Sequence, residues 1–149
     1  MSDPRNTVSF DTVDAVFYTF LTDNSTILYD ITKTNGSSQV GLAVKLSADK
    51  TIALTVDGDP VLGKLIKVET DNKGIVQVEG AMTLPGGNGA TLTAGTKVVG
   101  ALGASSAHGY IRSVATATGS YVQGTAQDAL NGRGQILDAS DSTNVVVNF

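Results

Sequence analysis

The sequence predicts an all-β fold, namely a single small β-barrel or sandwich-like domain of short strands with an extended N-terminal arm. The 149 residues suit one domain of ordinary size. Eighteen Thr, abundant Val and 17 Gly favour strands and turns over helices. Short apolar runs are separated by turn residues along the chain, which is typical of a barrel or a sandwich. We expect residues 1–35 to form the arm and the first strands, and residues 36–149 the barrel domain.

The N-terminal segment is aromatic, since residues 1–35 hold five of the eight aromatic side chains. Residues 13–21 would be apolar on both faces if extended, so such a strand is either central in a sandwich or covered from outside. A helix capped by Asp11 or Thr12 is the alternative, but the β-branched and aromatic content favours a strand. The segment is either an ordinary first strand or an arm that reaches onto a neighbouring subunit.

Residues 61–80 have the pattern of two strands joined by a tight turn. Apolar and polar residues alternate along both strands, which places one set inside and the other outside. The inner set is Leu62, Ile66, Val68, Val76 and Val78, and the outer set is Lys67, Glu69, Gln77 and Glu79. Residues 71–74 form the turn, in which Gly74 accepts a positive φ. Lys64 interrupts the inner face, which places the start of the first strand at a rim.

The remaining elements are short. Further strands are expected at residues 40–46, 51–56, 96–101, 110–115, 134–137 and 144–149. The last two form a closing hairpin, with Val145, Val147 and Phe149 on one face. Residues 125–130 are expected to form one helical turn, and the glycine-rich residues 85–89 a flexible loop.

Charge excludes some classes of partner. The net charge of −4 argues against a general binder of phosphate backbones, so nucleic acid is not an expected partner. No apolar run approaches the ~18 residues of a membrane span, and the polar opening residues are unlike a signal peptide, so we expect no membrane association. Residues 81–149 carry only three basic and three acidic side chains, against seven and eleven in residues 1–80. This half is either largely buried in the fold or partly covered by another chain.

No group of residues predicts catalysis, a cofactor or a metal site. The chain has no Cys and a single His, His108, so thiolate chemistry is excluded and a zinc site is not expected. Residues 58–64 nearly spell a phosphate-binding loop, but Leu65 stands where Ser or Thr is needed and a strand follows instead of a helix. Residues 138–144 are rich in oxygen donors, but they lack the Gly and the terminal Glu of a calcium loop and are typical of a turn. We therefore expect that the protein is not an enzyme.

Several short motifs follow one another along the chain. They are DPVLGK at residues 59–64, IKVETDNKGIVQVEG at 66–80, KVVG at 97–100, GYI at 109–111, GQIL at 134–137 and VVV at 145–147. In this order they resemble the head decoration (cement) proteins of tailed bacteriophages. The similarity covers about residues 40–149 and leaves the aromatic N-terminal segment outside it.

The resemblance implies a small β-barrel-like domain on the virion exterior, made in the host cytoplasm and bound to the outside of a mature capsid. It implies the major capsid protein as partner, and a homotrimer at threefold positions that bridges neighbouring capsomers. The residues expected at the interface are Phe10, Phe17, Tyr18 and Phe20 in the arm, and Pro85, Gly86, Asn88 and His108 in loops. The alternative is a receptor- or carbohydrate-binding module of a tail fibre, which the absence of Trp and the few aromatics after Tyr29 disfavour.

Overall fold

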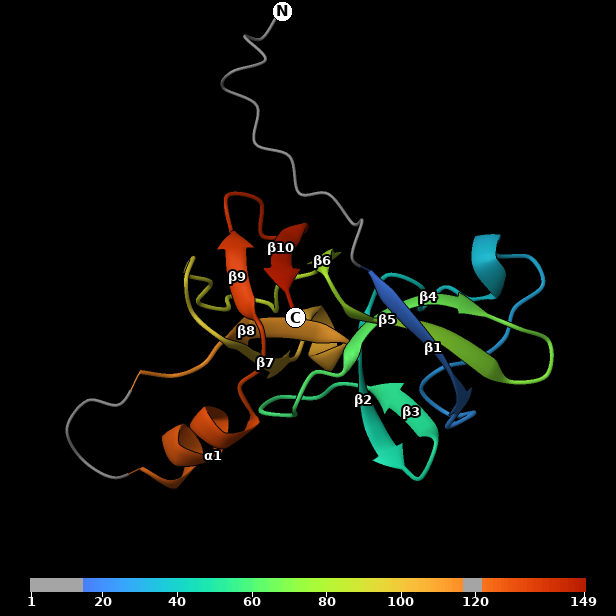
Figure 1. The fold of residues 1–149 in the computed structure, drawn as a ribbon, viewed down its shortest axis with the longest axis horizontal. Coiled ribbons are helices and arrows are strands. Elements are labelled where there is room, and N and C mark those ends of the chain that lie inside the picture. The colour runs from blue at the N-terminus through green and yellow to red at the C-terminus, as the bar shows by residue number, and fades with distance from the viewer. Residues whose placement is uncertain (1–14, 117–121) are drawn as a thin grey trace, which may run out of the picture.

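The structure is a computed structural model that describes residues 15–116 and 122–149 (Figure 1). Its first half is a closed five-stranded barrel with the strand order β1-β3-β2-β4-β5. The barrel strands are β1 (Val16–Thr22), β2 (Ala43–Ala48), β3 (Thr51–Leu54), β4 (Gly63–Val68) and β5 (Lys73–Glu79). The predicted all-β class and the β-barrel are therefore confirmed. Residues 16–22 are a strand of this barrel, whereas residues 1–14 of the expected arm, Phe10 among them, lie outside the described residues.

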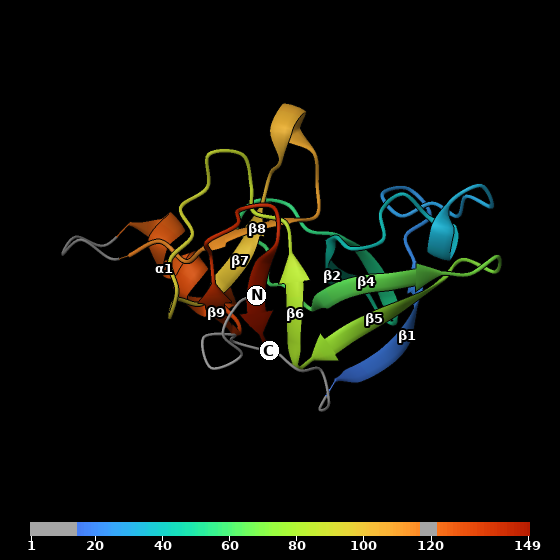
Figure 2. The same ribbon diagram turned by 90° about the horizontal axis from the view of Figure 1, so that it is seen from above.

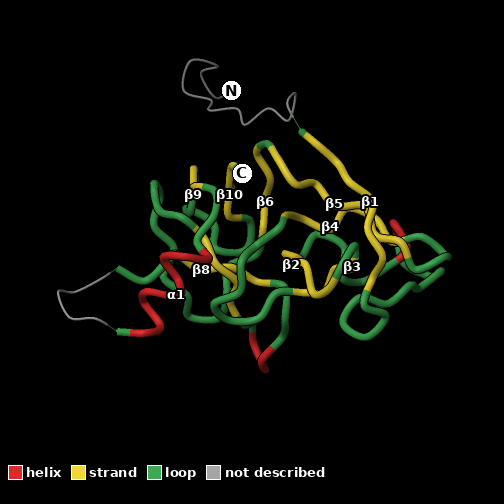
Figure 3. The backbone as a smooth tube through the Cα atoms, turned by 60° about the horizontal axis from the view of Figure 1, so that its bottom comes forward, coloured by secondary structure: helices red, strands yellow, loops and turns green. Residues whose placement is uncertain are grey.

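A second module lies beside the barrel (Figures 1, 2 and 3) and packs around a second apolar core, to which Ala43 of β2 and Val61 also contribute. Its elements are β6 (Ala81–Leu84), β7 (Val98–Ala101), β8 (Tyr110–Ser113), α1 (Gln123–Asn131), β9 (Gln135–Asp138) and β10 (Val145–Asn148). β6, β10 and β9 form one sheet, and β7 pairs with β8. The predicted closing hairpin is confirmed as β9–β10, with Val145 and Val147 buried and Phe149 packed against the same core. α1 is longer than the predicted turn, and none of the described helices could span a membrane.

The predicted hairpin of residues 61–80 is confirmed as β4–β5, which is antiparallel. However, β4 contains a bulge immediately after Leu65, so that Leu65 and Val68 both enter the barrel core. Ile66, predicted to face inward, is only half-buried for this reason. Lys64 is half-buried beside β6, where its ammonium donates to Thr83 Oγ1 at 2.9 Å and desolvation lowers its pKa.

Two other details of this hairpin differ from the prediction. Asn72, and not Gly74, has the left-handed φ of 57°, because Asn tolerates this conformation in a short hairpin loop. Gly74 lies in β5 instead, where a Cβ would come 2.9 Å from Ile52 Cδ1 in the barrel core. Gln77, predicted to lie outside, is buried, since its amide donates to the backbone carbonyls two and four residues further along the chain.

Arg133 connects the two modules. Its guanidinium donates to the carbonyl oxygen of Leu62 at 3.1 Å and to that of Val78 at 3.4 Å. Leu62 immediately precedes β4, and Val78 lies in β5. Its backbone pairs with that of Val98, where both N–H···O distances are 3.0 Å. The guanidinium carbon also lies 5.5 Å from the centre of the Phe149 ring. Arg133 therefore contacts the barrel and Phe149 through its side chain, and β7 through its backbone.

The fit between β7 and the segment after β3 gives a first testable prediction. A Cβ on Gly100 would lie 2.2 Å from the carbonyl oxygen of Val56. We expect Gly100→Ala to lower the free energy of unfolding by about 3 kcal/mol, because the backbone must move to relieve the overlap. Gly124 in α1 is the matched control: nothing lies within 4 Å of its Cβ position, so Gly124→Ala should raise stability by about 0.5 kcal/mol. Urea unfolding measures both, and wild-type stability of Gly100→Ala would contradict the packing described.

Candidate binding surfaces

The outward part of β1 is the first candidate surface, and we define the β1 face as Phe17 and Leu21, which lie on the same side of the strand. β1 pairs antiparallel with β5 along Val16–Leu21, and parallel with β3 only at Leu21 and Thr22. Val16 and Phe20 pack against the barrel core. In contrast, Phe17, Tyr18 and Leu21 are 51, 57 and 47% exposed, and the Tyr18 ring stands edge-on to that of Phe20 at a centroid distance of 6.4 Å. A partner of this surface would contact these exposed side chains.

The sequence located this surface only in part. Phe17 and Tyr18 were predicted interface residues and are exposed, whereas Phe20 turns mainly into the core. Leu21 was not among the predicted interface residues. It lies four residues after Phe17, and residues separated by an even number share one face of a strand. The two-residue period could therefore have indicated that Leu21 lies beside Phe17.

The predicted loop candidates lie in two loops of the second module, residues 85–89 and residues 104–109, whereas β1 belongs to the barrel (Figure 2). Backbone hydrogen bonds anchor residues 85–89, which were expected to be flexible. Gly86 N donates to the carbonyl of Ser142 at 2.8 Å, and Asn88 N donates to that of Leu102 at 2.9 Å. Pro85 and Gly86 are half-buried, whereas Asn88 and His108 are exposed. The structure therefore does not bring the aromatic and the loop candidates together.

Helix α1 is attached to the second module by polar contacts. The buried carboxylate of Asp128 accepts two hydrogen bonds from the Arg112 guanidinium, at 2.5 and 3.1 Å. Arg112 Nε also donates to Asp57 at 2.7 Å, and the Asn131 amide donates to the carbonyl of Gly58 at 2.8 Å. The hydrogen bond with Arg112 lowers the pKa of Asp128, and that with Asp128 raises the pKa of Arg112. Two of the six charged side chains of this half, Arg112 and Asp128, thus pair with each other.

The same helix exposes one apolar side chain near each of its ends, Val122 and Leu130, and we call these two residues the α1 surface. Val122, at the helix N-cap, is 54% exposed and Leu130 is 80% exposed, while the only buried residue of the helix is Asp128. A helix on a protein surface usually buries its apolar side and exposes its charges, so this arrangement is inverted. The α1 surface lies at the end of the molecule away from β1 (Figure 1). The sequence pattern predicts only a helical turn at residues 125–130 and does not indicate this surface.

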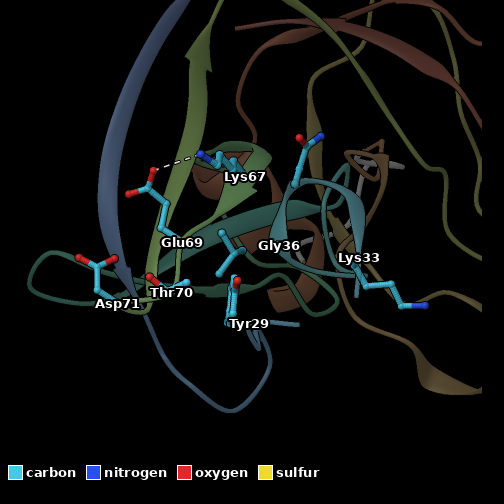
Figure 4. Close-up of a pocket in the computed structure, with 9 residues that line it drawn as sticks. Tyr29, Lys33, Gly36, Lys67, Glu69, Thr70 and Asp71 are labelled. Atoms are coloured by element: carbon cyan, nitrogen blue, oxygen red, sulfur yellow. Dashed lines mark hydrogen bonds and ion pairs between the residues drawn. The ribbon is translucent and has the colours of Figure 1, made fainter. Parts of the chain in front are cut away.

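A groove between the segment of residues 29–36 and the β4–β5 hairpin is the third candidate (Figure 4). It has a volume of about 630 Å³. Its lining consists of Tyr29, Lys33, Asn35, Gly36, Lys67, Val68, Glu69, Thr70 and Asp71. The ammonium of Lys67 and the carboxylate of Glu69 lie 3.3 Å apart on one wall. The groove joins segments more than 30 residues apart, so no local motif could have indicated it.

The oxygen-rich residues 138–144 form the turn between β9 and β10. Asp141 accepts hydrogen bonds from the Asn144 amide at 2.9 Å and from the backbone N–H of Thr143 at 2.8 Å, which lower the pKa of Asp141 to about 2. The segment at residues 58–64 leads into β4, a strand, as the sequence predicts. Within residues 15–116 and 122–149, no group of three or more His, Cys, Asp or Glu side chains is arranged to hold a metal ion.

Comparisons of the chain with family models, curated proteins and solved structures found no match.

Proposed function

We propose that the protein is a structural component of a tailed-phage virion, that it binds the outer surface of the mature capsid, and that it catalyses no reaction. It stabilises the shell by bridging neighbouring capsomers as a homotrimer at threefold positions, with the major capsid protein as its partner. The order of motifs along residues 59–147 supports this proposal through its resemblance to head decoration proteins. These motifs fall on strands of both modules, from β4 to β10.

The observation that carries the proposal is the presence of two apolar surfaces on different modules. The β1 face lies on the barrel, and the α1 surface lies on the second module, at the other end of the molecule (Figure 1). Exposed groups of large apolar side chains mark sites of protein–protein contact. A molecule with two such surfaces can contact two neighbours at once, which is what a bridge between subunits requires.

We assign the β1 face to the shell and the α1 surface to the neighbouring copy in the trimer. Burial of apolar area contributes roughly 25 cal/mol per Å², so each contact can be weak by itself. A trimer presents three β1 faces to the shell, and linked sites bind far more strongly than single ones. Capsomers clamped in this way must break several contacts before they separate, which explains how a small protein could stabilise a shell.

The trimer is tested by the mass of the protein in solution. Light scattering coupled to size-exclusion chromatography should give about three times the 15.2 kDa mass of the chain. Leu130→Asp should shift the population to the monomer, because it places a charge in the proposed contact between copies. Gln127→Asp, on the exposed side of the same helix, adds a charge beside that contact and should leave most of the protein trimeric. A monomeric wild type, or a Leu130→Asp variant that stays fully trimeric, would count against this assignment.

A further inference from the structure

The groove beside Tyr29 has a fixed shape, because the segment that forms one wall is held in place. Gly36 N donates to the carbonyl of Lys33 at 3.0 Å, and Asp30 N donates to the carbonyl of Gly36 at 2.8 Å. Gly36 has a φ of 80°, and a Cβ there would lie 1.9 Å from the carbonyl oxygen of Val68. Only glycine allows the segment to approach β4 this closely. The wall is therefore built into the fold and does not depend on a ligand.

The floor and the rim of the groove differ in character. Tyr29 packs against the barrel core and also lines the groove, so it offers a fixed aromatic surface (Figure 4). Around it stand donors and acceptors of hydrogen bonds: the ammonium of Lys67, the carboxylate of Glu69 and the amide of Asn35. Figure 4 shows Lys67, in the last turn-facing part of β4, and Glu69, just after the strand, pointing toward each other. Apart from Tyr29 and Val68, the lining offers little apolar area.

We propose that this groove binds a pyranose sugar. A sugar ring has an apolar C–H face that stacks on an aromatic side chain, and hydroxyl groups at its edge that need both donors and acceptors. An ammonium and a carboxylate 3.3 Å apart match two neighbouring hydroxyls, because one hydroxyl accepts from Lys67 while the other donates to Glu69. Asn35 supplies a donor and an acceptor in one group. A volume of about 630 Å³ lies within the usual range for small-molecule sites, roughly 300–1,000 Å³.

This inference goes beyond the proposed function and does not depend on it. A single sugar in an open, solvated groove would bind weakly, with a dissociation constant of about 1 mM or higher. Several copies on one particle would multiply that affinity for a glycan-coated surface.

The test is saturation-transfer difference NMR on the full chain with methyl β-glucoside, methyl β-galactoside, methyl α-mannoside and methyl β-N-acetylglucosaminide as probes. We expect at least one glycoside to receive saturation, most strongly at the C–H protons of one ring face. Tyr29→Leu retains an apolar side chain on the barrel core but removes the aromatic face, and Lys67→Met removes the donor. Each should weaken the binding of that glycoside about tenfold. Lys97→Met, at an exposed lysine of the second module, is the matched control and should bind normally.

No transfer to any of the four glycosides would overturn the proposal, and so would transfer that both groove variants leave unchanged. Urea unfolding of each variant confirms that the fold is retained. The mass in solution and the shell binding of the same variants should equal those of the wild type, because no groove residue belongs to the β1 face or the α1 surface. Failure of the sugar site and failure of the capsid proposal are therefore separate results.

Discussion

Replacing Asp128 by Ala is expected to lower the free energy of unfolding by about 3–5 kcal/mol, the usual cost of breaking a buried ion pair by removal of one partner. The side chain of Asp128 is only 6% exposed, and that of Arg112 is 22% exposed. Without Asp128, the guanidinium loses two hydrogen bonds and keeps only Asp57 as an acidic partner. The helix that carries the α1 surface also loses its main attachment. Chemical unfolding at neutral pH measures the loss.

Asp57→Ala is the control for this prediction. Asp57 pairs with the same guanidinium at 2.7 Å, but its side chain is 59% exposed. Ion pairs of this kind contribute about 0.5 kcal/mol, so the variant should remain close to the wild type. Equal losses for the Asp57 and Asp128 variants would contradict the view that burial makes the second pair important.

The same pair predicts a dependence on pH. The pKa of Asp128 is lowered in the folded protein by its hydrogen bond from Arg112, whereas in the unfolded chain it is about 3.9. A lowered folded pKa means that the contribution of this carboxylate to stability is complete above the unfolded value and is lost as the pH falls through the folded value. The difference in unfolding free energy between the wild type and Asp128→Asn should therefore be large at pH 7 and narrow at pH 3. A constant difference would contradict the role given to the charge.

Binding to the shell should be lost when the β1 face is made polar. We expect the double variant Phe17→Ser and Leu21→Ser to bind mature shells at least about 100-fold more weakly, since buried aromatic and aliphatic side chains often contribute most of the energy of an interface and three copies act together. Both side chains are about half exposed, so the barrel should still fold. Thr19→Ser, on the same exposed strand, is the control and should bind normally. Co-sedimentation with shells over a range of protein concentrations gives the affinities, and unchanged affinity of the double variant would remove the β1 face from the interface.

The parts of the fold that local chemistry determines could be predicted from the sequence. Alternation of apolar and polar residues located β4, β5 and the β9–β10 hairpin, because a strand with one buried face imposes a two-residue period. Details that depend on distant neighbours could not be predicted. Gly74 is required by the approach of Ile52, which lies on β3 and is far from it in the sequence.

The candidate surfaces also differ in whether local sequence or distant neighbours determine them. Phe17 and Tyr18 could be singled out because a strand with aromatic residues on both faces cannot bury all of them in one barrel. Leu130 could not be predicted to be exposed. Its helix is held by Asp128 and not by apolar contacts, and that attachment depends on Arg112 of β8, which is distant in the sequence. The groove beside Tyr29 depends on Gly36 meeting β4, which only the tertiary structure reveals.

The most direct test of the central proposal uses the unmodified protein. The proposal implies a tailed phage whose genome carries the gene. The protein is mixed with mature, expanded shells of that phage and, separately, with its unexpanded precursor shells, and the shells are sedimented. The proposal predicts that the protein sediments with the mature shells until three copies occupy each threefold position, and that it does not sediment with the precursors. If the protein remains in the supernatant with mature shells at every concentration, the proposal is wrong.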